Sequence, residues 1–449
     1  MIHTFTALNQ PMALDVGSGA VHALDELALE ALKLWDSMDR QTIAAQLSER
    51  FDPQEVEETL AELDELERMG QLNAPDDYEH VDVLSPGVVK AMCLHAAHDC
   101  NLRCKYCFAG AGEYHGRNRC MLSFETGKKA LDWLVKMSGN RVHLEVDFFG
   151  GEPLMNFDVV KELVAYGRSL EAPFNKKFKF TTTTNGLSLN DEIIDFLNRE
   201  MDNVVISIDG RPEVHDRMRP TPNGRGSYEH IVPNALRLAN SRNQQRYYIR
   251  GTFTAHNLDF SKDVLHLADA GFEQLSIEPV VADASCDYAL SQKDLPKILD
   301  EYEILAREYL KRRRDGRWFN FFHFMVDLQG GPCLRKRLTG CGAGNEYVAV
   351  TPEGDIYPCH QFVGREGFLM GSVLDGSFNR EIQQKFAANH VLSKTACKSC
   401  WARFFCSGGC AANAHAFHGD ISSPYDLECQ MERKRLECAM ALYALEQES

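Results

Sequence analysis

A strand–helix alternation over residues 90–315 constrains the fold more than any other feature of the sequence. Six short segments of strand-like composition alternate with segments whose apolar residues recur at helical spacing. The expected strands are Val89–His95, His143–Phe149, Phe178–Thr184, Val204–Ile208, Tyr247–Thr254 and Gln274–Pro279. Repeated βα units build a parallel sheet, so we predict an α/β fold with a partial (β/α)6 barrel of the TIM type. The active residues of such a barrel lie at the carboxyl ends of its strands.

Three cysteines, Cys100, Cys104 and Cys107, follow the first expected strand. Their C-x3-C-x2-C spacing places three thiolates on one loop, at the end of the barrel where chemistry is expected. Three thiolates can hold three irons of a 4Fe–4S cube and leave the fourth iron open to a reactant. A structural zinc site completed by His95 or His98 is the alternative interpretation.

This loop resembles the signature of the radical S-adenosylmethionine (SAM) superfamily. There the open iron chelates SAM, and one electron releases a 5′-deoxyadenosyl radical that abstracts a hydrogen atom from the substrate. The resemblance extends to the ends of the next three strands. It implies SAM contacts at Tyr106, Gly150, Gly151, Glu152, Pro153, Asn185, Ser207 and Asp209. It also makes Arg219 a candidate catalytic residue, because a guanidinium could pair with a carboxylate of SAM or of a peptide.

Nine of the 15 cysteines lie in residues 330–449. Metal ligation explains them better than disulfides in a reducing compartment. Their spacing resembles the SPASM extension of radical SAM enzymes, which implies two auxiliary 4Fe–4S clusters and three clusters in all. The implied ligands of the first are Cys341, Cys359 and Cys410. Those of the second are Cys397, Cys400, Cys406 and Cys429. A pair of zinc knuckles is the alternative interpretation.

Cys333 leaves two alternatives open, because it precedes Cys341 by eight positions. It either completes the first auxiliary cluster or leaves one iron open to a substrate thiolate, a soft ligand that suits iron. His360, which follows Cys359, is the second candidate catalytic residue. In the sulfatase-maturing relatives an aspartate stands at the matching position and acts as a base.

Residues 1–80 form a separate acidic segment, with 18 Asp and Glu against 4 Lys and Arg. Alternating patterns predict strands at Thr4–Ala7, Met12–Val16 and Val21–Leu24. Helical patterns follow at Glu26–Trp35, Arg40–Ser48 and Asp52–Met69. Three strands and three helices are typical of a winged-helix unit. The net charge of −14 in this segment would repel nucleic acid and favour a basic partner.

The predicted domains are therefore 1–80, the barrel at 90–315 and the SPASM domain at 330–449, with a linker at 71–89. The first resembles PqqD-like winged-helix domains, which bind the leader of a ribosomally made peptide along a strand edge and a helix. Overall, the chain is most similar to maturases of SCIFF peptides. The likeness is carried by residues 1–5, 14–16, 18–22, 100–108, 112–117, 340–342 and 357–362. Those enzymes join a cysteine sulfur to the α-carbon of another residue.

This resemblance implies an enzyme that installs a thioether between a cysteine sulfur and an acceptor carbon in a ribosomally synthesised, cysteine-rich peptide. Its partners would be the precursor peptide, with the leader on residues 1–80, and a reductant such as flavodoxin or ferredoxin. Two alternatives remain: a sulfatase-maturase type of oxidation of Cys or Ser to formylglycine, and a non-catalytic iron–sulfur electron carrier. Neither a secretion signal nor an apolar run of spanning length occurs, so we expect a cytoplasmic protein without membrane partners.

Overall fold

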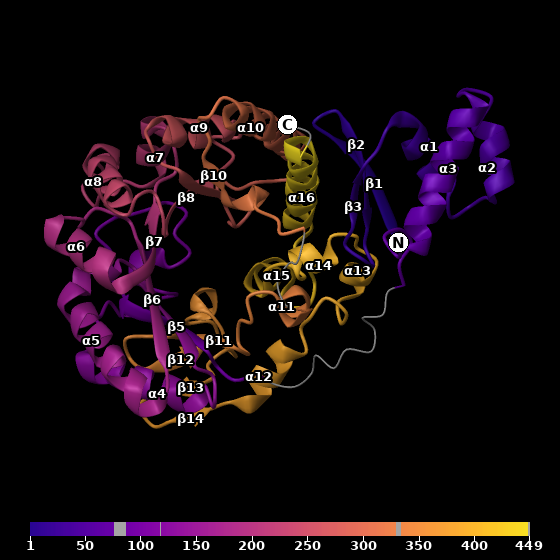
Figure 1. The fold of residues 1–449 in the computed structure, drawn as a ribbon. Coiled ribbons are helices and arrows are strands. Elements are labelled where there is room, and N and C mark those ends of the chain that lie inside the picture. The colour runs from indigo at the N-terminus through magenta and orange to yellow at the C-terminus, as the bar shows by residue number, and fades with distance from the viewer. Residues whose placement is uncertain (76–86, 117, 329–333, 448–449) are drawn as a thin grey trace.

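One curved sheet of 11 strands organises the computed structural model, which describes residues 1–75, 87–116, 118–328 and 334–447 (Figure 1). The strands run in the order β10-β9-β8-β7-β6-β5-β4-β11-β12-β13-β14. The central parallel strands are β4 (Ala91–Ala97), β5 (His143–Gly150), β6 (Lys177–Thr184), β7 (Met201–Ser207), β8 (Tyr247–Phe253) and β9 (Gln274–Pro279). All six predicted strands are thus confirmed, and the sheet stays open between β10 and β14, which confirms a partial barrel.

Helices cover the convex face of this sheet (Figure 1). They are α4 (Phe124–Met137), α5 (Phe157–Phe174), α6 (Asp191–Glu200), α7 (Pro212–Met218), α8 (Tyr228–Ser241), α9 (Ser261–Asp269) and α10 (Leu295–Arg314). Alternate strand residues such as Val146 and Phe148 are buried beneath them. Because side chains alternate along a strand, Asp147 points to the opposite, concave face, which we call the inner face.

The C-terminal region joins the barrel sheet instead of packing as a separate body. Strand β11 (Tyr347–Val350) pairs parallel with β4, and β12 (Asp355–Tyr357), β13 (Gly371–Ser372) and β14 (Ser377–Phe378) continue antiparallel. At the other edge, β10 (Asn320–Phe321) pairs parallel with β9. The sequence predicted none of these strands, because each has only two to four residues.

The remaining C-terminal elements are mostly short helices that carry the cysteines. They are α11 (Leu334–Thr339), α12 (Arg380–Ala387), α13 (Thr395–Lys398), α14 (Arg403–Cys406), α15 (Ala411–His418) and α16 (Asp426–Gln447). Single turns of 3-10 helix are η2 (Gly110–Gly112), η3 (Pro153–Asn156), η4 (Phe322–Phe324) and η5 (His360–Phe362). The sequence missed the 22-residue α16, because it packs against both α10 and the N-terminal strands and its buried residues follow no single stripe.

The N-terminal module has the predicted three strands and three helices. They are β1 (Ile2–Ala7), β2 (Gln10–Asp15), β3 (Val21–Ala23), α1 (Glu26–Leu34), α2 (Arg40–Leu47) and α3 (Pro53–Arg68). Each helix starts at an aspartate whose carboxylate accepts backbone N–H groups of the first turn. The helices build a core of their own around Ile43, Val56 and Leu60. The predicted linker at 71–89 falls mainly outside the described residues.

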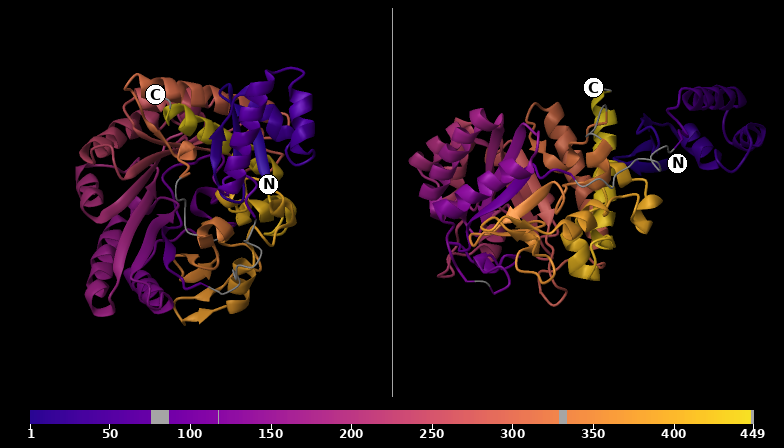
Figure 2. Two further views of the ribbon diagram at one scale, coloured as in Figure 1. Left: turned by 45° about the vertical axis from the view of Figure 1, so that its right-hand side comes forward. Right: turned by 90° about the horizontal axis from the view of Figure 1, so that it is seen from below.

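The module is docked on the C-terminal region through β1 and projects beyond α16 (Figure 2). The His3 ring stacks on Trp401 with 4.0 Å between ring centroids, and its Nε2 lies 3.1 Å from Glu437 Oε1. The strands of the module thus lie beside the cysteine-bearing region, whereas its helices face away (Figure 1). Among the described helices, none is long and apolar enough to span a membrane.

Replacing Phe148 by alanine tests the core beneath the inner face. Phe148 has no exposed surface and stacks on Phe180 at 5.8 Å. Phe148→Ala should lower the free energy of unfolding by about 3–5 kcal/mol, because it leaves a cavity. Denaturant titration followed by circular dichroism measures this. Phe174→Ala, at an aromatic residue with 53% exposure, is the matched control and should change stability by less than about 0.5 kcal/mol. Equal losses of stability in the two variants would contradict the placement of Phe148 in the core.

Candidate active site

The three cysteines of the predicted SAM loop lie together directly after β4. Burial is the main cause that raises the pKa of Cys100 to about 12, and the charges of the Glu152 carboxylate and of the Cys104 and Cys107 thiols contribute to the rise. The backbone N–H of Leu102, 3.4 Å from Cys100 Sγ, opposes this shift. Thiols that shift one another's pKa in this way lie close enough together to bind one metal cluster.

Hydrogen-bond donors point at the sulfurs of this loop. The N–H of Ala111 lies 3.4 Å from Cys107 Sγ, and Arg219 Nη1 lies 3.9 Å from Cys104 Sγ. Donors to sulfur stabilise thiolates and tune an iron–sulfur cluster. The loop therefore fits a 4Fe–4S cube held by three cysteines.

A close backbone contact holds the predicted Gly-Gly-Glu-Pro segment against this loop. The Gly151 N–H donates to the Ala97 carbonyl at 2.7 Å. A Cβ on Gly150 would lie 2.2 Å from Ala97 O, and one on Gly151 would lie 2.0 Å from Asp99 O. Gly150 also has φ +118°, which favours glycine. Pro153 then begins η3. Only glycine allows the end of β5 to approach the cysteine loop so closely.

Glu152 ties this segment to the end of β6. Its buried carboxylate accepts the Asn185 N–H at 2.7 Å, the Thr184 hydroxyl at 2.8 Å and the Leu154 N–H at 3.0 Å. Burial raises the pKa of Glu152 to about 7. The Asn185 side-chain amide lies 3.6 Å from Cys100 Sγ. Both predicted SAM contacts thus lie beside the first cysteine.

Asp209, Tyr106 and Arg219 form one hydrogen-bonded group. The Tyr106 hydroxyl donates to Asp209 Oδ2 at 2.6 Å, and Arg219 Nε donates to Oδ1 at 3.0 Å. The Thr252 N–H adds a third bond at 3.0 Å. Ser207 ends β7, two residues before this aspartate. Asp209 therefore positions both Tyr106 and Arg219 beside Cys104, which the sequence did not reveal.

The first predicted auxiliary group brings Cys341, Cys359 and Cys410 together. Burial raises the pKa of Cys359, and the thiols of Cys410 and Cys341 add to the shift. Burial also raises the pKa of Cys410 to about 11. Cys341 is exposed, whereas Cys359 is buried. Cys333, the possible fourth ligand, lies outside the described residues.

The second predicted auxiliary group is formed by four cysteines that line one small pocket of ≈ 80 Å³: Cys397, Cys400, Cys406 and Cys429. Arg433 also lines it and donates a hydrogen bond to the Cys400 sulfur. Four thiols around one cavity are the donor set of a 4Fe–4S cluster. The assignment of individual cysteines as ligands remains our prediction.

Polar side chains that the sequence analysis missed gather on the inner face. Asp147 on β5 accepts a hydrogen bond from the Thr181 hydroxyl on β6 at 2.8 Å. Arg250 on β8 lies 3.8 Å from Glu278 on β9, and their side chains are 55% and 29% exposed. The signal in the sequence was a polar residue at every second position of otherwise apolar strands. This accessible, charged surface can contact a polar ligand such as a peptide.

His360 lies between the SAM loop and the first auxiliary group. Its ring is 5.4 Å from Phe108, the residue after Cys107, and 4.9 Å from Phe149. Its Nδ1 lies 3.3 Å from the Tyr347 hydroxyl. Burial lowers the pKa of His360 to about 4, and the charge of Arg250 contributes. The structure therefore brings this candidate catalytic residue to the inner face, whereas Arg219 stays bound to Asp209.

Two family models match the chain in the regions that hold these cysteines. A 4Fe-4S single cluster domain matches residues 83–233, and the SPASM iron-sulfur cluster-binding domain matches residues 341–401. The radical SAM cyclopropyl synthase TigE of Paramaledivibacter caminithermalis is 22% identical over 360 residues, covering 74% of this chain and 70% of TigE. The matches support a radical SAM enzyme with a SPASM domain. Enzymes of this family use SAM and 4Fe–4S clusters.

Two further relatives extend over most of the chain. The cysteine-type anaerobic sulfatase-maturating enzyme of Clostridium novyi is 27% identical over 340 residues, covering 71% of this chain and 86% of that enzyme. The mycofactocin maturase MftC of Mycolicibacterium smegmatis is 29% identical over 394 residues, covering 78% of this chain and 85% of MftC. This radical SAM/SPASM chain thus resembles several maturases of different names.

Solved structures confirm the fold of this radical SAM/SPASM chain. Native anSMEcpe with bound AdoMet has a TM-score of 0.65 at 20% identity and covers 79% of this chain and 99% of its own. Streptococcus suis SuiB bound to S-adenosylmethionine has a TM-score of 0.53 at 17% identity, and the match covers 95% of this chain and 98% of SuiB.

Removing Asp209 tests the group that positions Tyr106 and Arg219. Asp209→Ala should lower the free energy of unfolding by about 3–5 kcal/mol, because it leaves Arg219 as an uncompensated buried charge. Denaturant titration under anaerobic conditions measures the loss. Asp158→Ala removes a carboxylate with 90% exposure that also pairs with a cation, and it should cost less than about 1 kcal/mol. A similarly small loss for Asp209→Ala would rule out a structural role for the pair.

Proposed function

We propose that this enzyme joins a cysteine sulfur to the carbon of an acceptor residue in a ribosomally synthesised, cysteine-rich peptide, as SCIFF maturases do. The observation that carries the proposal is the first auxiliary group, where three described cysteines, Cys341, Cys359 and Cys410, meet beside the inner face. A substrate thiolate bound there, as a soft ligand of iron, would lie near the radical chemistry. In the alternative, Cys333 completes this group.

The N-terminal module supports the leader-binding part of the proposal. Its sheet has the order β1-β2-β3, so β3 is an edge strand to which an extended peptide could pair. Residues 1–80 carry a net charge of −14, which suits a basic leader. Streptococcus suis SuiB has also been crystallised with its precursor peptide SuiA, in a structure that matches 94% of this chain with a TM-score of 0.51.

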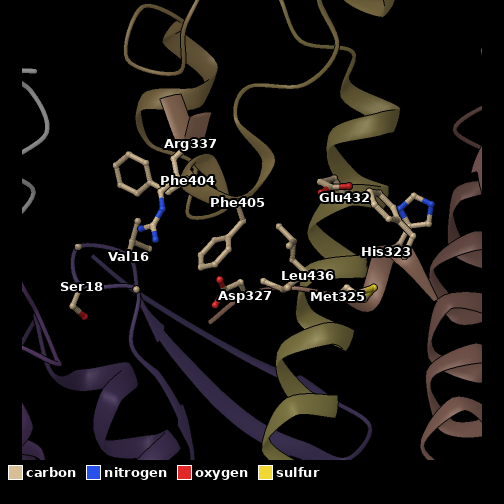
Figure 3. A pocket seen from close by; sticks show the side chains of 14 residues that line it. Val16, Ser18, His323, Met325, Asp327, Arg337, Phe404, Phe405, Glu432 and Leu436 are labelled. Atoms are coloured by element: carbon tan, nitrogen blue, oxygen red, sulfur yellow. The ribbon is translucent and has the colours of Figure 1, made fainter. Parts of the chain in front are cut away.

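A pocket of ≈ 250 Å³ lies where this module meets the rest of the enzyme (Figure 3). Val16 and Ser18 line it from the module, and Phe322 and His323 line it from η4. His323 Nε2 is 3.4 Å from Glu278 Oε1 on the inner face. The pocket thus supports a path by which the peptide runs from the module to the inner face.

The proposed cofactors are SAM and three 4Fe–4S clusters, one at Cys100, Cys104 and Cys107 and two auxiliary. When bound, they supply the radical that abstracts a substrate hydrogen and accept the surplus electron. The chain positions the reactants: the Gly150 and Gly151 backbone fixes the SAM loop, and the inner face holds the peptide.

Formylglycine formation is the second candidate, favoured by the Clostridium novyi relative that covers 71% of this chain. His360 stands where those enzymes carry the aspartate that acts as a base, which weakens this candidate. A sulfatase-type peptide offers the direct comparison, because its product would be an aldehyde that reacts with a hydrazide probe.

Anaerobic incubation with a cysteine-rich precursor, SAM and reductant tests the proposed reaction. One cross-link should make the peptide about 2 Da lighter and remove one alkylatable thiol, because one hydrogen atom and one proton leave. Mass spectrometry with and without iodoacetamide measures both. A product of unchanged mass would indicate epimerisation, and formation of 5′-deoxyadenosine without any peptide product would refute the peptide substrate.

Iron analysis tests the three clusters. Reconstituted enzyme should hold about twelve irons per chain, since each cube has four. Cys104→Ala should lower this to about eight and abolish 5′-deoxyadenosine formation. Cys286→Ser is the control at a cysteine with no assigned role and should keep both. Zinc in place of iron would support the zinc alternative, whereas full iron without 5′-deoxyadenosine would support an electron carrier.

A further inference from the structure

Asp147 is an acidic side chain of the inner face that lies close in register to the cysteine-bearing region. It pairs in register with Cys93 on β4, and Cys93 pairs with Ala349 on β11. Cys93 also accepts a hydrogen bond from the Tyr347 hydroxyl, which reaches His360. Asp147 thus faces the same space as the residues beside Cys359.

The environment of Asp147 suits a proton acceptor. The residue is partly buried, and this burial raises the pKa of its carboxyl group to about 6. The Thr181 hydroxyl and the positive charge of Arg250 oppose this shift and keep the carboxylate ionised at neutral pH. Cys93 and Tyr347 also face it, and its negative charge raises the pKa of both groups. An accessible carboxylate with a raised pKa is a stronger base than an ordinary aspartate.

Within the described parts of the chain, Thr181 is the one residue that donates a hydrogen bond to Asp147, and it contacts Oδ1. Oδ2 is therefore available to a ligand. Glu278, a carboxylate of the inner face on β9, differs from Asp147, because Arg250 and Arg435 lie 3.8 and 3.6 Å from its oxygens. Two guanidinium groups hold Glu278 as an anion and leave it a poor base.

We propose that Asp147 takes the proton from the thiol of the peptide cysteine that becomes the sulfur of the cross-link. The inference rests on the proposed function. In this step the S–H bond breaks, an O–H bond forms on Asp147 Oδ2, and the electron pair stays on sulfur as a thiolate. The step is a proton transfer and needs no oxidant. The thiolate is the form that binds iron and forms bonds to carbon.

The experiment compares Asp147→Asn with the wild type over pH 5–9, measuring cross-linked peptide and 5′-deoxyadenosine separately. Cross-linking by the wild type should rise with pH through about 6, because Asp147 must be ionised to accept the proton. Asp147→Asn should cross-link about 100-fold more slowly at pH 7 and recover near pH 9, where a thiol ionises unaided. It should still form 5′-deoxyadenosine and bind the precursor with unchanged affinity, measured by fluorescence anisotropy.

Two further variants separate catalysis from folding. Asp147→Glu should restore part of the rate, and Thr181→Val should move the rise to higher pH, because it removes a hydrogen bond that stabilises the carboxylate. Asp158→Asn is the matched control: its carboxylate is 90% exposed on α5, which covers the opposite, convex face, and this variant should behave as the wild type.

An unchanged pH profile in Thr181→Val, or a wild-type rate in Asp147→Asn, would overturn the role of Asp147. If Asp147→Asn does not take up iron, the pH profile of Thr181→Val alone tests the role of Asp147 as a proton acceptor. A wild-type enzyme that forms no cross-link with any cysteine-rich precursor would instead refute the proposed function.

Discussion

The contact between the end of β5 and the loop after β4 is the constraint on which the rest of the site depends. The Gly151 N–H bonds to Ala97 O at 2.7 Å, and the Glu152 N–H bonds to Asp99 O at 2.9 Å. No side chain fits between these backbones, since a Cβ on Gly151 would lie 2.0 Å from Asp99 O. The approach brings Glu152 beside Cys100 and fixes the base of the cysteine loop.

A second constraint is the continuous sheet. Because β11 pairs parallel with β4, the turn that carries Cys359 and His360 is joined by backbone hydrogen bonds to the strand that leads to Cys100. Phe108 and Phe149 then pack around His360. The SPASM region and the barrel thus share one framework, which ties the turn that carries Cys359 to the strand before Cys100.

The concave side of this framework carries several charged side chains. Its charges come from different strands: Asp147 from β5, Arg250 from β8 and Glu278 from β9. None belongs to a short motif. Such residues are typical of a surface that selects and handles a substrate, whereas we propose that the motifs at the strand ends serve the shared cofactor chemistry.

The sequence by itself determined the six barrel strands, the three-strand, three-helix module and the cysteine spacings, because these depend on local periodicity and on ligands close along the chain. Only the tertiary structure decided that β11 extends the barrel sheet, that α16 joins the module to the barrel, and that Asp209 holds Tyr106 and Arg219. It also decided that Asp147 and His360 share the inner face, although 212 positions separate them in the sequence. These contacts join residues far apart along the chain, and local patterns carry no information about which distant strands become neighbours.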